Sequence, residues 1–154
     1  MPSPLIALMR SWMFVPGHKQ KMIDKALGLD ALDALMLDLE DGVAPAEKPS
    51  ARELVARTLD QLAASSARKP AAYVRTNAVG SPHMFDDLAA AVRPGLDGLV
   101  LPKVNSPDKI ETVEDLLDKL EPGKGMERNS TRLLIAIERD RKSTRLNSSH
   151  VSES

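Results

Sequence analysis

The sequence alternates short apolar runs with longer amphipathic stretches, and this alternation limits the possible folds more than any other feature. We expect strands at residues 11–15, 34–39, 72–76, 98–102 and 133–137, where the apolar runs lie. Apolar residues recur at helical spacing in the intervening stretches, which predicts helices at residues 18–29, 46–64, 84–92 and 106–123. This order predicts an α/β fold with a parallel sheet and helical crossovers, either an open sheet or part of a barrel.

Composition excludes several classes of partner and chemistry. The 154 residues include 21 Lys and Arg against 22 Asp and Glu, so a net charge of -1 gives no electrostatic case for a nucleic acid or an anionic membrane. The absence of Cys excludes disulfides, thiolate metal sites and cysteine nucleophiles. The opening run MPSPLIALMR is short and has no charged leader, so we expect no signal peptide, no membrane span and a cytoplasmic location.

The alternating pattern stops after Glu138. Residues 139–154 contain no alanine and show neither a helical nor a strand period, which predicts a disordered tail. The whole chain is also well short of the ~250 residues of a closed (β/α)8 barrel.

Polar residues follow the first two expected strands, and the carboxyl ends of parallel strands are where function collects. Pro16 and Gly17 form a turn before a helix, which either offers backbone N–H groups to a phosphate or carboxylate or only shapes the chain. Asp38, Glu40 and Asp41 end the second strand. Three carboxylates beside an apolar strand are costly unless they are solvated, paired or bound to a cation, and alternation directs Asp38 and Glu40 the same way.

The next three strands end in charged residues as well. Arg75 lies in an apolar strand and must find an anion, either a substrate carboxylate or enolate oxygen or the acidic group after the second strand. Lys103 fits a Schiff-base, stabilising or ion-pairing role, of which we favour the last two because nothing identifies a desolvated amine. Glu138 is a candidate ligand for a hard cation such as Mg²⁺. Together these residues predict a site for an anionic substrate bound through a metal.

Five motifs in this order resemble a known family. They are RSWMFVPG at residues 10–17, LDLEDGVAPAEK at 37–48, VRTN at 74–77, GLDGLVLPKV at 95–104 and LLIAIE at 133–138. The set is similar to the HpcH/HpaI aldolase and citrate lyase beta-subunit family, the CoA-ester lyases. The resemblance implies a (β/α)8 TIM barrel of the phosphoenolpyruvate/pyruvate type, of which this chain has about four and a half βα units. It also implies Mg²⁺-dependent cleavage of a 3-hydroxyacyl-CoA ester, of the citryl-CoA or malyl-CoA type, to an acyl-CoA and a keto acid.

The resemblance also implies roles for the strand-end residues. Arg75 holds a substrate carboxylate or the enolate oxygen, and Glu138 is one of two carboxylate ligands of Mg²⁺. The carboxylates after the second strand line the same mouth, with Asp41 acting through metal-bound water, while Lys103 supports the cluster. From the residues alone, Pro16 and Gly17 are candidate substrate-binding residues, through the turn that they form.

The end of the chain departs from the family pattern. In the family a small hydroxyl residue follows the metal glutamate and a second acidic ligand lies on the next strand, whereas here Arg139 follows Glu138 and no sixth strand is expected. We therefore expect a partial TIM-barrel lyase domain at residues 1–138, a non-native tail at 139–154, and a fragment that is inactive alone.

Two alternatives stay open. The first is a non-catalytic half-barrel that binds a metabolite or packs on a partner, and the second is a CoA-independent keto-acid aldolase of the same superfamily. The expected ligand is an acyl-CoA or a small dicarboxylate or keto acid. The full-length parent is expected to be a homo-oligomer, because a half-barrel exposes two strand edges.

Overall fold

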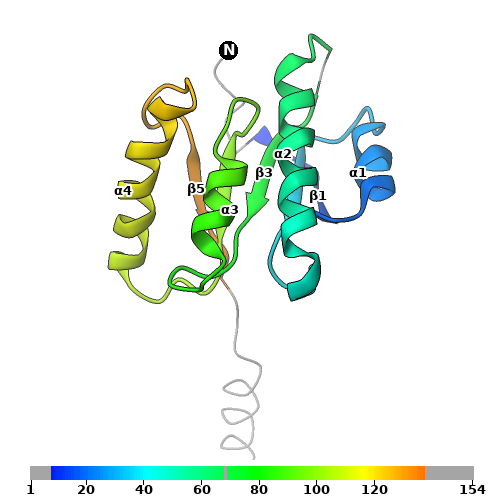
Figure 1. Cartoon of the computed structure of the whole chain (residues 1–154). Helices are drawn as coiled ribbons and strands as arrows, with labels where there is room; N and C mark the ends of the chain where they lie inside the picture. Colours follow the sequence, from blue (N-terminus) through cyan, green and yellow to red (C-terminus); the bar gives the residue numbers. More distant parts are fainter. Residues whose placement is uncertain (1–7, 68, 138–154) are drawn as a thin grey trace, which may run out of the picture.

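The expected strands form one parallel sheet in which neighbours in sequence are neighbours in space (Figure 1). The computed structural model describes residues 8–67 and 69–137. Its strands are β1 (Trp12–Pro16), β2 (Ala34–Asp38), β3 (Ala71–Arg75), β4 (Gly98–Leu101) and β5 (Arg132–Ile135). The order β1-β2-β3-β4-β5 has no reversal, whereas a doubly wound open sheet reverses its strand order at a switch point. Sequential addition of βα units on one side is how a (β/α)8 barrel is built, so the sheet corresponds to part of a barrel.

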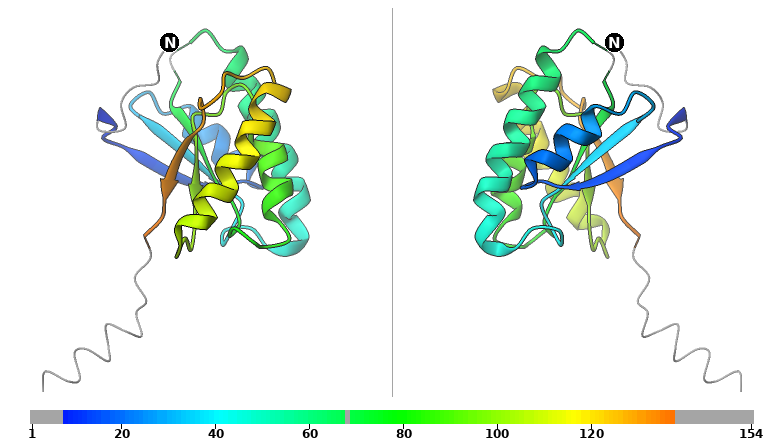
Figure 2. Two further views of the ribbon diagram at one scale, coloured as in Figure 1. Left: turned by 90° about the vertical axis from the view of Figure 1, so that its left-hand side faces the viewer. Right: turned by 90° about the vertical axis from the view of Figure 1, so that its right-hand side faces the viewer.

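The four α-helices of the described residues cover one face of this sheet (Figure 2). They are α1 (Gln20–Leu27), α2 (Lys48–Ala64), α3 (Met84–Ala91) and α4 (Pro107–Gly123). The helix expected from residue 46 begins instead with a 3-10 turn, η2 (Pro45–Glu47), because prolines lie on both sides of its start. Within the described residues no helix combines the length and apolarity needed to cross a bilayer.

The main core lies between the sheet and the helices. Leu35 and Leu37 of β2 and Leu39, the residue after it, occupy alternate positions and are fully buried on this side. Val55 and Leu59 of α2 are equally buried, in phase with the helical period predicted from sequence. This packing fixes the register of β2, because a slip of one residue would turn its leucines away from the helices.

The opposite face of the sheet has its own smaller cluster. Met36, Tyr73 and Val100 are buried there and Trp12 packs against them, with its ring centroid 4.8 Å from that of Tyr73. Gly98 lies beside Tyr73 in the sheet, and a Cβ at Gly98 would be only 2.5 Å from Tyr73 Cε1. A side chain at this position is therefore excluded by the aromatic ring. No described helix covers this face, which is the interior face of a closed barrel (Figure 2).

Candidate functional site

A buried ion pair joins the carboxyl ends of β2 and β3. Pro16, Asp38 and Arg75 are direct partners across the sheet and so form one row. Arg75 Nε donates to Asp38 Oδ1 and Arg75 Nη2 to Asp38 Oδ2, each at 2.8 Å. The Asp38 side chain is 6% exposed and that of Arg75 16%. The pair lies on the face opposite the helices, next to the apolar Met36 and Tyr73 layer.

The loop after β2 holds Asp38 in its charged form. The backbone N–H of Glu40 donates to Oδ1 at 2.9 Å and that of Gly42 to Oδ2 at 2.8 Å. Burial alone would raise the pKa of Asp38, but the hydrogen bonds from Arg75 and from these two amides outweigh it and lower the pKa below its ordinary value. The pKa of Arg75 is raised, chiefly by its hydrogen bonds to Asp38 and against the effect of burial.

Two glycines allow this close packing. A Cβ on Gly42 would lie 2.6 Å from Asp38 Oδ2, and a Cβ on Gly17 would lie 2.8 Å from the Asp38 carbonyl oxygen. The Gly17 N–H donates to that same oxygen at 2.8 Å. The turn after β1 is thus fastened to β2, and this N–H is not free for an anion. A substrate contact at Pro16 and Gly17 stays a prediction, and groups of this turn other than the Gly17 N–H would have to make it.

The remaining surface of the Arg75 guanidinium faces Phe14 and Glu40. Arg75 Cζ lies 5.4 Å from the centroid of the Phe14 ring, a cation–π distance. Arg75 Nη1 is 3.8 Å from Glu40 Oε1, too far for a hydrogen bond. Among the described residues Nη1 thus makes no hydrogen bond, while Nε and one N–H of Nη2 donate to Asp38. The arrangement fixes the guanidinium plane, and Nη1, which is at ion-pair distance from Glu40, keeps N–H donors that an oxygen anion could accept.

A second polar network, centred on Lys48, supports the loop after β2. The sequence analysis did not predict it. Lys48 is 6% exposed and its Nζ donates to the carbonyl oxygens of Leu39 and Glu40, at 2.7 and 3.1 Å. It also donates to Asn77 Oδ1 at 2.8 Å. Asn77 in turn donates from Nδ2 to the fully buried Asp87, at 2.6 Å.

A signal for this network exists in the sequence. Lys48 is in phase with the apolar positions Ala51 and Val55 of its helix, and Asp87 lies beside Leu88 on the buried side of α3. A charged residue on an apolar helix face must find a buried partner, and this rule would have singled out both residues.

Of the other predicted site residues, neither Asp41 nor Lys103 makes a side-chain hydrogen bond or an ion pair with Asp38 or Arg75, although the charge of Asp41 is one of those that raise the pKa of Arg75. Asp41 and Lys103 are exposed, and no hydrogen bond or ion pair joins Lys103 to another described residue. Lys103 adopts a left-handed backbone conformation with a φ of 53°, which is uncommon for a residue with a side chain. Glu138 lies outside the described residues, as does the tail expected at 139–154. The roles of these residues stay predictions.

Carboxylates suitable for a cation are present, but they do not form a complete site in the described part of the chain. There, no three His, Asp or Glu side chains are grouped so that they could hold a metal ion. Both oxygens of Asp38 already accept hydrogen bonds from Arg75 and from the loop. If this chain holds Mg²⁺, oxygen donors would have to come from Glu40 or Asp41 together with groups outside residues 8–67 and 69–137.

Fold and site together define a class of protein. A parallel sheet in sequential order, helices on one face and a charged pair at the strand carboxyl ends are the features of a (β/α)8-barrel domain with its site at the strand ends. The chain belongs to the HpcH/HpaI aldolase/citrate lyase family, whose sequence model matches residues 10–142. The predicted family and the predicted fold class are both confirmed.

The proteins that this chain resembles are much longer than the chain itself. The citrate lyase subunit beta of Leuconostoc mesenteroides subsp. cremoris is 37% identical over 131 residues, which are 85% of this chain and 42% of that protein. The structure of CitE from Mycobacterium tuberculosis in complex with magnesium and acetate is 28% identical with a TM-score of 0.58, covering 90% of this chain and 48% of that one. Haloferax volcanii malate synthase, in its magnesium/glyoxylate complex, shares the fold with a TM-score of 0.72 at 21% identity, covering 84% of this chain and 42% of that one. This chain thus spans less than half the length of each of these proteins.

Proposed function

We propose that the protein is part of a Mg²⁺-dependent carbon–carbon lyase that cleaves a 3-hydroxyacyl-CoA ester, of the citryl-CoA or malyl-CoA type, to an acyl-CoA and a keto acid. The observation that carries this proposal is the Arg75 guanidinium, which Asp38 fixes at the strand ends of a domain of the citrate lyase family. Residues 1–138 are the partial barrel, residues 139–154 are a non-native tail, and the fragment is inactive alone. The whole protein is a cytoplasmic homo-oligomer.

The chemistry needs a fixed positive charge at one place. The substrate's 3-hydroxyl loses its proton, the bond between C2 and C3 breaks, and C3 leaves as the carbonyl carbon of the keto acid. The bonding electrons pass to the thioester as an enolate, which then takes a proton at C2. Arg75 stabilises the developing enolate oxygen, or holds the substrate carboxylate, through the edge that carries Nη1, because Nε and one N–H of Nη2 are committed to Asp38.

The carboxylates of the site favour an added cation. The positive charge of Arg75 is paired with Asp38 and lies at ion-pair distance from Glu40, and the buried Lys48 is bound to uncharged oxygens. An anionic substrate beside these carboxylates would be stabilised by a further positive charge. Mg²⁺, if bound here, would supply that charge and stabilise the developing negative charge as a Lewis acid; the M. tuberculosis CitE structure was solved with magnesium. We assign Glu138 as one ligand, with Asp41 acting through metal-bound water and Lys103 supporting the cluster.

The test is an assay of the full-length gene product and of the 154-residue chain with a panel of 3-hydroxyacyl-CoA esters, with and without Mg²⁺. We expect Mg²⁺-dependent release of an acyl-CoA and a keto acid by the full-length protein, and none by the shorter chain. Release of a keto acid from hydroxy keto acids that lack CoA would support the CoA-independent aldolase instead. Binding of an acyl-CoA with no turnover of any substrate would support the non-catalytic module.

Arg75→Ala tests the central residue within that assay. Removal of one preorganised charge-stabilising group lowers kcat by about 100- to 1,000-fold in other enzymes, and we expect a loss of this size. Arg93→Ala is the matched control, because Arg93 pairs with the exposed Asp60 on the helical side of the domain. An unchanged kcat in Arg75→Ala, with the fold intact by circular dichroism, would refute the assigned role.

A further inference from the structure

Lys48, the first residue of α2, is a buried ammonium group whose hydrogen-bond partners are all uncharged. Its three donors match three acceptors: the carbonyl oxygens of Leu39 and Glu40 and the amide oxygen of Asn77, at 2.7 to 3.1 Å. No ion pair involves Lys48 among the described residues. Burial of a lysine without a contacting carboxylate is costly, and its three hydrogen bonds are what offset that cost.

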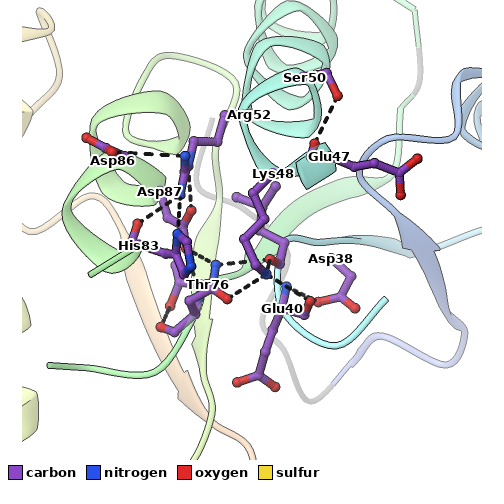
Figure 3. Close-up of polar contacts among 12 residues, drawn as sticks. Asp38, Glu40, Glu47, Lys48, Ser50, Arg52, Thr76, His83, Asp86 and Asp87 are labelled. Atoms are coloured by element: carbon purple, nitrogen blue, oxygen red, sulfur yellow. Dashed lines mark hydrogen bonds and ion pairs between the residues drawn. The ribbon is translucent and has the colours of Figure 1, made fainter. Parts of the chain in front are cut away.

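The contacts of Lys48 join three elements at one point (Figure 3). Leu39 and Glu40 follow β2, Asn77 follows β3, and Lys48 itself begins α2. Asn77 reinforces the junction, since its Nδ2 donates to the Leu39 carbonyl oxygen at 3.0 Å. The ammonium group thus clamps the chain that leaves β2 against the chain that leaves β3.

The far side of this junction is anchored by a buried carboxylate. Asp87 accepts hydrogen bonds from the backbone N–H of Asn77 at 2.8 Å and from Asn77 Nδ2 at 2.6 Å. Its other oxygen accepts from Arg52 Nε at 2.8 Å (Figure 3). Arg52 belongs to α2 and Asp87 to α3, so the orientation of Asn77 toward Lys48 is set by two helices.

Glu40 links this junction to the buried ion pair. Its carbonyl oxygen accepts from Lys48, while its own N–H donates to Asp38 Oδ1. Asp38 then holds Arg75 through both oxygens. The backbone of Glu40 is therefore held by two hydrogen bonds, one from Lys48 to its carbonyl oxygen and one from its N–H to Asp38.

We propose that Lys48 is a positioning residue: its ammonium group holds the Leu39 and Glu40 backbone so that the Glu40 N–H stays on Asp38 and Asp38 keeps the Arg75 guanidinium in place. The inference deepens the proposed function and rests on it for the chemical purpose of Arg75. The clamp itself is a structural claim, and its test uses no turnover.

The first measurement is NMR on the unsubstituted 154-residue chain. The Lys48 ammonium protons are expected to exchange with water at least about 100-fold more slowly than those of the exposed Lys119 of α4, and to show couplings across the hydrogen bonds to the carbonyl carbons of Leu39 and Glu40. Exchange as fast as that of Lys119, without such couplings, would overturn the proposal.

The second measurement compares Lys48→Met with the matched control Lys119→Met. Met keeps most of the volume of the lysine stem but donates no hydrogen bond, so we expect exchange of the Glu40 and Gly42 amides and of Arg75 Nε–H to become at least about tenfold faster. The Arg75 Nε resonance should also move. Amides of α4, such as that of Leu117, serve as the internal reference, because their exchange rates should change only when the global stability of the protein changes. Lys119→Met should leave all of these signals as they are.

Unchanged exchange at Glu40, Gly42 and Arg75 in folded Lys48→Met would overturn the proposal, and so would a loss of protection equal to that of the α4 amides. Should that variant not fold, Lys48→Gln, whose amide still donates to one carbonyl, is measured in its place, with the same signals deciding. Should neither fold, the couplings in the unsubstituted chain decide. If the clamp is found in this chain but the full-length protein has no lyase activity, the proposed function is refuted and the role of Lys48 stays intact.

Discussion

Gly42→Ala tests whether the loop after β2 is shaped around the Asp38 carboxylate. Gly42 is exposed to solvent, so burial alone suggests that a methyl group would be tolerated. The added Cβ would instead lie 2.6 Å from Asp38 Oδ2, whereas ordinary van der Waals contact begins at 3.4 Å. Either the loop or the carboxylate must move, and both are held by hydrogen bonds.

The expected cost combines two effects. Overpacking of a tight site costs about 1–3 kcal/mol, and weakening a hydrogen bond to a charged group costs about 1.5–3 kcal/mol. The two overlap, because the same movement relieves the clash and breaks the bond from the Gly42 N–H to Asp38. We therefore expect the free energy of unfolding to fall by about 2–4 kcal/mol. The pKa of Asp38 should rise as well, since the Gly42 amide is one of the groups that lower it.

Urea unfolding followed by circular dichroism measures the first effect, and the carboxyl ¹³C shift of Asp38 against pH measures the second. Gly123→Ala is the matched control, since nothing lies within 4 Å of its Cβ position at the end of α4 and alanine favours a helix by about 0.5–1 kcal/mol. A Gly42→Ala protein that unfolds within about 0.5 kcal/mol of the unsubstituted chain, with the same Asp38 pKa, would refute this account of the loop.

Three further predictions follow from the same structure. Because folding lowers the pKa of Asp38, its ionised form stabilises the fold above the unfolded pKa of 3.8, and this part of the free energy of unfolding should be lost as pH falls through the folded pKa; Asp38→Asn should abolish that step in acid titrations. Gly98→Ala places a Cβ 2.5 Å from Tyr73 Cε1 and 2.8 Å from the Arg132 carbonyl oxygen and should lower the free energy of unfolding by about 1–3 kcal/mol in the same urea assay, whereas a neutral result would mean that both the ring and the β5 backbone can move aside. Arg52→Met leaves the fully buried Asp87 without its ion-pair partner and should cost about 3–5 kcal/mol, and a loss under about 1 kcal/mol, as expected for an exposed pair, would contradict the burial seen here.

The arrangement of strands and helices could be predicted because hydrophobic period is a local property. The apolar runs mark strands whichever partners they meet, and the helix from Pro107 begins where Ser106 and Pro107 indicate. The choice between an open sheet and a barrel could not be made from period, because both use the same units. The strand order decided it, and that order depends on contacts between segments.

The pairing within the site was only partly predictable. Parallel strands bring Asp38 and Arg75 to one edge of the sheet. The acidic group after the second strand was therefore one of the two anions expected to pair with Arg75, the other being a substrate oxygen. The sequence does not say which of the three carboxylates pairs. The register answers this, since Asp38 is the direct partner of Arg75 across the sheet, while Glu40 and Asp41 come after the strand ends.

The Asp38–Arg75 pair is better explained by function than by stability. Removing two charges from water costs several kcal/mol for each ion, and apolar replacement of a buried pair is often neutral or stabilising. The neighbouring positions on this face are Met36, Tyr73 and Val100, which show that the row could have been filled with apolar side chains. The loop nevertheless spends two backbone amides on Asp38 and a glycine on the space beside it. We expect so many groups to hold one guanidinium in place where that guanidinium stabilises a charge that forms only during a reaction. A donor that is already in place needs no reorganisation when that charge forms.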